Sequence, residues 1–311
     1  GGRSRVDPGL TEAFTAPIGW DEEPGGTVRV MSDGYTCFDV KLDGGVATVT
    51  LSRGEKLNTM IPAFWNELPA LVRDLDATGE ARVVVLASTG RHFSAGMDLS
   101  VFGGTRPEGE TGRLRSNLRA NVLHLQETFS VFEKARMPVL AAVQGGCIGG
   151  AVDMVTACDM RYATEDAFFC VQEINIGMTA DVGTLQRLPR LIPEGVCREL
   201  AYTGRRMPAA EAKAVGLVNE VYDDHEALLD GVHEVARTIA SRSPLAVYGS
   251  KQMITYARDH STADSLDHMA TWQAGMFQPA DMAEAFAAQA EGREGDFDDL
   301  LPFRGGLADG V

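Results

Sequence analysis

Two glycine-rich stretches of the sequence could hold an anion through backbone N–H groups. The first, GGCIGG at residues 145–150, follows an apolar run and opens a predicted helix. Glycine lets a ligand approach the backbone closely, and free N–H groups at a helix N-terminus favour negative charge. The second, FSAGMDL at residues 93–99, could supply one more N–H group, from Met97. Together they would suit an enolate oxygen that forms during a reaction.

Other interpretations of these stretches are weaker or stay open. A dinucleotide fingerprint has the spacing GxGxxG and a later acidic residue, whereas this sequence has GGxxGG and no obvious acidic partner. Tight packing of a helix on a strand, with no ligand, remains an alternative. A nucleophilic Ser94 is disfavoured, because a GxSxG elbow needs glycine at position 92, which is His92.

Three acidic residues could transfer protons or could have purely structural roles. Glu173 lies in the run FFCVQEINIG, and apolar surroundings raise the pKa of a carboxyl group toward neutrality. Asp181 precedes Val-Gly-Thr-Leu, so from these residues alone a helix N-cap is the simpler interpretation. Asp153 falls in the first turn of the helix after the glycines, where an acid stabilises the helix N-terminus.

The strands that would position these residues are clear in the sequence. Residues 37–42 and 46–51 are rich in β-formers and are joined by Asp-Gly-Gly at 43–45, which predicts a hairpin. The apolar runs at 83–87 and 138–143 predict buried strands. Each glycine-rich stretch follows one of these two runs.

Helices alternate with the strands. Amphipathic periodicity predicts helices at 64–75 and 114–134. The alternation continues to about residue 220, which indicates an α/β fold. After that point the pattern is helical only, with one helix beginning at Ser243-Pro244 and another over 280–291.

The composition is that of an ordinary globular protein. The 311 residues are 44% hydrophobic and 23% charged, which excludes extensive disorder and fits about two domains or one large one. With 28 Lys and Arg against 44 Asp and Glu, the net charge of −16 argues against a nucleic-acid partner or an anionic membrane surface. Five cysteines without CxxC spacing favour a reducing compartment, and no metal site is expected.

The apolar stretches predict no membrane association. The most apolar one, residues 137–158, contains Gln144, Asp153 and several glycines, so it reads as strand, turn and helix of a soluble core. The opening residues GGR lack the apolar segment of a signal peptide. The cytoplasm is therefore the default location.

FSAGMDL, followed by VLAAVQGGCIGGAVDMVTACDMRYA, resembles the crotonase (enoyl-CoA hydratase/isomerase) superfamily, and the resemblance runs from about residue 37 to the C-terminus. Residues 166–189, DAFFCVQEINIGMTADVGTLQRLP, are most similar to the branch that converts 3,5-dienoyl-CoA to 2,4-dienoyl-CoA. RDHS at 258–261 and SLDHMATW at 265–272 point to the same branch.

The resemblance implies a fold and its division along the chain. We expect an α/β fold, a crotonase-like spiral of ββα units with a C-terminal helical segment. Residues 1–34 would form an extended arm and residues 35–235 the spiral core. Residues 236–311 would be helical, close the pocket and take part in oligomerisation. The resemblance implies a homotrimer or homohexamer.

The resemblance also implies an acyl-CoA substrate, with no separate cofactor because coenzyme A enters with the substrate. The thioester oxygen would lie between the N–H groups of Met97 and Gly150. Glu173 would be the base at carbon 2 and Asp181 the acid at carbon 6. Asp153 would position a group or tune Glu173. Hydratases of the family carry Glu at this position and lack an acid at position 181, so hydration is the disfavoured alternative.

Substrate contacts are assigned less specifically. The candidates for substrate binding are Lys56, Leu57, Ala95, Gly149 and Trp272. Arg53, Lys56 and Lys251 are candidates for the phosphates of coenzyme A. Met60, Phe102 and Trp272 could line the acyl pocket, although core packing is the simpler role for each. A noncatalytic acyl-CoA binder is the remaining alternative, and the full set of acids argues against it.

Overall fold

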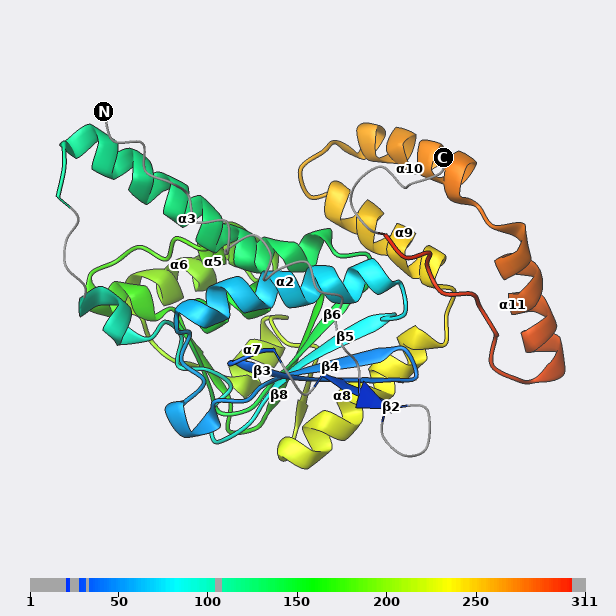
Figure 1. Ribbon diagram of the computed structural model, residues 1–311, viewed down its shortest axis with the longest axis horizontal. Coiled ribbons are helices and arrows are strands. Elements are labelled where there is room, and N and C mark those ends of the chain that lie inside the picture. The colour runs from blue at the N-terminus through cyan, green and yellow to red at the C-terminus, as the bar shows by residue number, and fades with distance from the viewer. Residues whose placement is uncertain (1–20, 23–27, 32–33, 104–107, 304–311) are drawn as a thin grey trace.

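The computed structural model describes residues 21–22, 28–31, 34–103 and 108–303, and within them two β-sheets form the body (Figure 1). The large sheet has the strand order β1-β2-β3-β4-β5-β6-β8-β11, and the small sheet has the order β10-β9-β7. The strands of the large sheet are β1 Asp21–Glu22, β2 Val28–Met31, β3 Phe38–Asp43, β4 Val46–Leu51, β5 Val83–Ser88, β6 Val139–Val143, β8 Met160–Thr164 and β11 Glu220–Tyr222. Those of the small sheet are β7 Gly146–Ile148, β9 Phe168–Cys170 and β10 Met207–Pro208.

Helices follow the strands and then dominate the last part of the chain. The α-helices are α2 Pro62–Thr78, α3 Thr111–Lys134, α4 Gly150–Thr156, α5 Thr184–Arg187, α6 Glu194–Thr203, α7 Ala209–Ala214, α8 His225–Ala240, α9 Pro244–Tyr256, α10 Thr262–Met276 and α11 Pro279–Glu291. Short 3-10 helices are η1 Gly54–Lys56, η2 Leu99–Gly103, η3 Gln172–Ile176 and η4 Leu188–Arg190. The helices predicted at 64–75, at 114–134, from Ser243-Pro244 and at 280–291 are confirmed.

The large sheet changes from antiparallel to parallel at β4. β3 and β4 form the predicted hairpin, in which Gly44 and Gly45 have φ values of 55° and 78°. Only glycine adopts such a pair of angles readily, and this turn matches the twist of the strands it joins. From β4 onward each neighbour is parallel, which requires a crossover between strands. The helices and loops of the crossovers carry the candidate site residues.

Both faces of the parallel strands are buried. Every residue of β5 and of β6 is buried, as expected for strands covered on both sides. One face packs on α8 through Leu228, Val232 and Ala236. The other face packs on α2 and on the second half of α3, so helices cover the sheet from two sides, as Figure 1 shows.

Each crossover also contributes to a second layer beside the large sheet. Isolated bridges pair Met60 with Met97 and Ser94 with Cys147, and β7 then pairs with β9. Successive turns of the chain therefore stack through the large sheet and again through this second layer. The result is a spiral of repeated strand–strand–helix units.

Two boundaries differ from the sequence-based division. The described part of the expected N-terminal arm is not a free extension, because β2 pairs antiparallel with β3 and β1 pairs with β2. Residues 1–20 lie outside the described residues. The boundary expected at 235/236 falls inside α8, which ends at Ala240, so the break between helices lies at 241–243.

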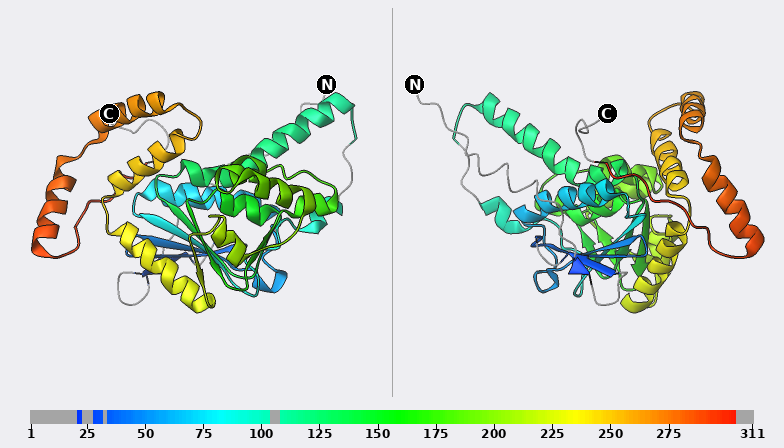
Figure 2. Two further views of the ribbon diagram at one scale, coloured as in Figure 1. Left: turned by 180° about the vertical axis from the view of Figure 1, so that it is seen from behind. Right: turned by 45° about the vertical axis from the view of Figure 1, so that its right-hand side comes forward.

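The first half of α3 and the last two helices project from the body. On α3, Phe129 and Phe132 are buried, whereas Leu118 is 62% exposed. The views in Figure 2 place this projecting half of α3 and the helices α10 and α11 at opposite ends of the molecule. The predicted apolar stripe of α3 is thus covered only in its second half by the described residues.

Candidate active site

The second layer brings three distant stretches of sequence to one place. Ser94 N–H donates to Gly146 O, Ile148 N–H donates to Ser94 O, and Gly149 N–H donates to Cys170 O. The chain therefore leaves neighbouring segments of this layer at three places that lie next to one another, at residues 95–97, 149–150 and 172–173. These are the stretches that the sequence singled out.

The N–H groups of Met97 and Gly150 both lie at this junction. Gly96 has a φ of 79°, and a Cβ there would lie 2.5 Å from Ile148 O and 3.2 Å from Gly150 N, so only glycine allows the approach. Among the described residues, neither N–H group donates to a protein acceptor. Gly150 is also the first residue of the buried helix α4.

Ser94 and His92 support the loop and are not a nucleophile and its base. The Ser94 hydroxyl donates to Asn58 O at 2.8 Å and accepts from Gly96 N–H. His92 Nδ1 accepts the N–H of Gly146 at 2.9 Å, and burial lowers the pKa of this imidazole. The structural role of His92 was not predicted, because sequence spacing does not show which turn the side chain reaches.

Glu173 lies against the glycine turn. It sits in η3, and a Cβ on Gly149 would lie 3.2 Å from its Oε1 atom. Burial, together with the charges of Asp153 and Asp181, raises the pKa of Glu173 to about 7. A carboxyl group with this pKa can accept and return a proton near neutral pH.

Asp153 is fully buried. Its Oδ1 accepts the N–H of Thr184 at 2.6 Å, whereas Oδ2 has no hydrogen-bond partner in the described structure. Burial raises the pKa of Asp153 to about 6, against the lowering effect of the Thr184 hydrogen bonds. Asp153 lies in the first turn of α4, as the sequence predicted. It also binds the start of α5, which the sequence did not indicate.

Asp181 is exposed at the edge of the same group. The N-cap residue of α5 is Gly183, so the alternative of Asp181 as a helix N-cap is not what the structure shows. The backbone O of Asp181 accepts from Gln126 Nε2 of α3 at 2.7 Å. Because its charge raises the pKa of both Asp153 and Glu173, the three carboxyl groups lie within electrostatic reach of one another.

The loop at 53–59 closes the other side of the junction. Leu57 O accepts the N–H of Ala95 at 2.9 Å, and buried Asn58 donates to Thr89 O. Leu57 and Asn58 have φ values of 55° and 49°, which these contacts hold in place. Lys56 is exposed, whereas Arg53 donates to Thr59 O.

Two candidate substrate contacts lie elsewhere. Lys251 is 6% exposed, and its ammonium donates to Phe132 O and Met137 O and pairs with Asp159 at 3.0 Å. The hypothesis that Lys251 binds coenzyme A phosphates is therefore wrong, because its donors are already used inside the core. Trp272 packs edge-on against Tyr248 in the C-terminal region.

Met60 does reach the junction, and its sulfur would lie 3.1 Å from a Cβ on Gly150. Met60 is fully buried, so it forms part of the wall as well as of the core. The side chain of Phe102 lies outside the described residues.

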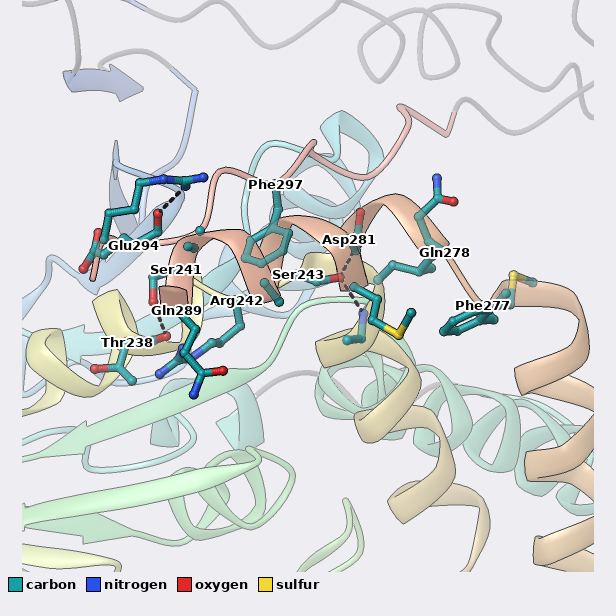
Figure 3. A pocket seen from close by; sticks show the side chains of 18 of the residues that line it. Thr238, Ser241, Arg242, Ser243, Phe277, Gln278, Asp281, Gln289, Glu294 and Phe297 are labelled. Carbon is teal, nitrogen blue, oxygen red and sulfur yellow. Dashed lines mark hydrogen bonds between the residues drawn. The ribbon is translucent and has the colours of Figure 1, made fainter. Parts of the chain in front are cut away.

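The large cavity of the structure is not at the acids. It has a volume of about 1070 Å³ and lies between α8, α9, α10, α11 and the following segment, and Trp272 lines it. Figure 3 shows Ser243 and Asp281 hydrogen-bonded across its wall, with Phe277 and Phe297 at its sides. None of the three acids lines this cavity, so we assign the chemistry to the junction of the glycine turns.

Within the described residues, no helix is long and apolar enough to cross a membrane. In the same part of the chain, no group of three or more His, Cys, Asp or Glu side chains could hold a metal ion.

Comparison with known proteins assigns the family. Residues 41–300 match the model of the enoyl-CoA hydratase/isomerase family. The chain belongs to this family. Its predicted fold class, a crotonase-like spiral with a C-terminal helical segment, is confirmed by solved structures. An enoyl-CoA hydratase from Bacillus anthracis has a TM-score of 0.75 and 30% identity, and the match covers 87% of this chain and 98% of that one.

Curated relatives carry a more specific name. The mitochondrial Delta(3,5)-Delta(2,4)-dienoyl-CoA isomerase of Homo sapiens is 43% identical over 253 residues, which are 80% of this chain and 77% of the human protein. A peroxisomal protein of that name from Arabidopsis thaliana is 38% identical over 259 residues, 82% of this chain and 93% of the relative. The expectation of a cytoplasmic location is wrong, because these relatives are named mitochondrial and peroxisomal, which points to an organelle.

Proposed function

We propose that this protein is an isomerase that converts a 3,5-dienoyl-CoA to the 2,4-dienoyl-CoA. The observation that carries the proposal is the position of Glu173, with a pKa of about 7, against the turn that presents the Gly150 N–H group. The names of relatives at 38–43% identity support the same reaction. The substrate class, an acyl-CoA, follows from the family.

The reaction needs two proton transfers and one stabilised anion. Glu173 takes a proton from carbon 2, and the electron pair moves into the conjugated system, so negative charge collects on the thioester oxygen. The N–H groups of Met97 and Gly150 stabilise this oxygen, as an oxyanion hole does. Asp181 gives a proton to carbon 6, which leaves double bonds at carbons 2 and 4. The proton gained at carbon 6 balances the one lost at carbon 2.

Asp153 acts in this scheme by setting the proton affinity of Glu173. Its charge is the second largest cause of the raised pKa of Glu173, after burial. Its Oδ1 atom holds the N–H of Thr184, three residues after Asp181. Asp153 is thus connected to both proposed proton-transfer groups without direct contact with the substrate.

The substrate backbone and its coenzyme A portion would extend over the neighbouring loops. Leu57, Ala95 and Gly149 present backbone at the junction, and Lys56 and Arg53 stand at its rim. We place no substrate contact at Trp272 within one chain, because it lines the C-terminal cavity. We also propose a homotrimer or homohexamer, for which the exposed apolar side chains of α10 and α11 are suitable contacts.

The activity is tested with a panel of 3,5-dienoyl-CoA and 2-enoyl-CoA esters. We expect the absorbance of a 2,4-dienoyl thioester to appear without water uptake. Asp181→Asn should lower kcat about 100- to 1000-fold, because the acid for carbon 6 is removed. Asp39→Asn, which changes an exposed aspartate on β3, is the matched control and should keep the full rate.

Three results would contradict the proposal. An unchanged rate in Asp181→Asn would remove this residue from the mechanism. Rapid loss of 2-enoyl-CoA absorbance that survives Asp181→Asn, with no reaction of the dienoyl ester, would identify a hydratase. Tight binding of acyl-CoA esters with no turnover of any would identify a noncatalytic binder.

A further inference from the structure

The segment 181–184 carries two groups of the site but belongs to no strand. Asp181 stands at its start, and the N–H of Thr184 at its end donates to Asp153. Val182, Gly183 and Thr184 are buried, and Gly183 has a φ of 135°. A segment in this conformation needs contacts from other elements to keep it there.

Arg187 supplies such contacts from α5. Its guanidinium approaches Val182 O at 3.5 Å, and a Cβ on Gly183 would overlap it. The same group donates to the hydroxyl of Ser130 on α3 at 2.9 Å. Arg187 therefore fills the space directly behind the backbone of residues 182–183.

Glu133 holds Arg187 in that place. Its Oε2 atom accepts from Nε and Nη2 of Arg187 at 3.0 and 2.7 Å, a two-point ion pair whose side chains are 14% and 22% exposed. Its Oε1 atom accepts from Arg258, at the end of α9, at 2.6 Å. A paired guanidinium with several N–H groups fixes direction as well as charge.

Arg187 also acts on the buried acid through its charge. The Arg187 charge lowers the pKa of Asp153, against the larger effect of burial. The charge of Asp181 raises the pKa of Asp153 and the charge of Arg187 lowers it, and Asp153 in turn raises the pKa of Glu173. The sequence pattern did not indicate that Arg187, Glu133 and Arg258 form one group of ion pairs.

We propose that Arg187, anchored by Glu133, is a positioning residue that holds the segment 181–184 and thereby aims the carboxyl group of Asp181. The proposal rests on the proposed function, because Asp181 is the acid of that reaction. Arg187 touches neither substrate nor reacting atoms. Its loss should disturb proton delivery and leave acyl-CoA binding intact.

The experiment compares Arg187→Gln and Arg187→Lys with a matched control. Arg136→Gln is that control. Arg136 pairs with Asp76, and the two side chains are similarly buried, 18% and 25% exposed. This ion pair does not involve the segment 181–184. Arg187→Gln should lower kcat about tenfold or more with KM unchanged, since a misplacement of about 1 Å can lower rates about 100-fold. Arg187→Lys keeps the charge but has fewer fixed N–H groups, so it should recover kcat only in part.

Hydrogen exchange provides a readout that needs no turnover. In Arg187→Gln the amides of residues 182–184 should exchange faster than in the wild type, and in Arg136→Gln they should not.

The outcomes separate this proposal from the proposed function. If the wild type does not isomerise dienoyl-CoA, the function is wrong, and exchange at 182–184 still decides whether Arg187 holds the segment. The positioning role is overturned if exchange is unchanged in Arg187→Gln. It is also overturned if KM rises while kcat stays constant, or if Arg136→Gln loses as much kcat.

Discussion

The inner edge of the spiral, residues 93–99, 145–153 and 172–184, and the C-terminal arm, helices α10 and α11, are built on different principles. At the inner edge, the backbone N–H and C=O groups of successive turns bind one another, and Met97 N–H and Gly150 N–H have no acceptor among the described residues. In the arm, Leu266 and Phe286 are 66% and 64% exposed. The inner edge is completed within one chain, whereas the apolar surface of the arm has no cover from the described residues.

The large cavity and the proposed active site lie in different regions of the molecule. The cavity of about 1070 Å³ lies beside the arm, and its carboxylate Asp281 is hydrogen-bonded to Ser243. Asp153 and Glu173 of the inner edge have raised pKa values instead, because burial and the repulsion of neighbouring carboxylates act on them together. Perturbed proton affinity next to free N–H groups is the more specific sign of a reaction site.

The largest expected effect is a difference in kcat between variants of two acids, Glu173 of the inner edge and Asp281 of the arm. Glu173→Gln should lower kcat about 1000-fold, because the base for carbon 2 is removed and a general base contributes rates of this order. Asp281→Asn should leave kcat unchanged, although it lines the larger cavity. Steady-state rates with a 3,5-dienoyl-CoA measure both. A large loss in Asp281→Asn alone would move the active site to the arm.

A second effect concerns the junction of the two regions. Lys251→Met should lower the free energy of unfolding by about 3 kcal/mol, because it leaves two buried carbonyl groups and Asp159 without their cation. Arg293→Met, at an exposed ion pair after α11, should leave the denaturation midpoint in place. Urea unfolding followed by circular dichroism checks both. Equal midpoints for the two variants would contradict the assignment of Lys251 as a structural residue.

The third effect is a pH dependence that only the inner edge should show. The base must be ionised to act, so kcat/KM should rise about tenfold per pH unit below pH 7. The value follows from the pKa of Glu173, which burial raises to about 7. The profile in Asp281→Asn should overlay that of the wild type. A rise of kcat/KM between pH 4 and 5 instead would mean that the carboxyl group of Glu173 is solvated during the reaction.

The smallest effect is expected in the arm itself. Phe286→Ser should change the free energy of unfolding of one chain by less than about 0.5 kcal/mol, because the ring is already mostly exposed. If α11 provides contacts between copies, the same variant should shift the mass measured by light scattering toward the monomer. An unchanged mass would exclude this part of α11 from such contacts.

Much of the fold could be predicted from local patterns. The Asp-Gly-Gly turn gave the β3–β4 hairpin, the β-branched run gave β5, and the spacing of Phe64, Leu68 and Leu75 gave the buried face of α2. These features depend on neighbours in the sequence, and a period of two or 3.6 residues records them directly. The pairing of β2 with β3 was not predicted, because it depends on a partner outside the N-terminal segment.

The candidate site also combines features that the sequence predicted with contacts that it did not. Local pattern indicated the glycine turns of Met97 and Gly150 and a pocket role for Glu173, whereas the roles of Asp181 and Asp153 came from the resemblance to the family. Local pattern did not reveal that Asp153 holds Thr184 N–H, or that Lys251 is enclosed by the core rather than facing a phosphate. Such contacts join residues 31 and more than 100 positions apart.

The sequence by itself determined which groups are available for proton transfer and for anion binding, since residue type sets donors, acceptors and charge. Only the tertiary structure decided their environment. Stacking of successive turns placed Glu173 beside the glycine turn and buried Asp153, and burial is what moves a carboxyl pKa toward neutrality. The same stacking left the arm outside the body, because its helices meet neither sheet.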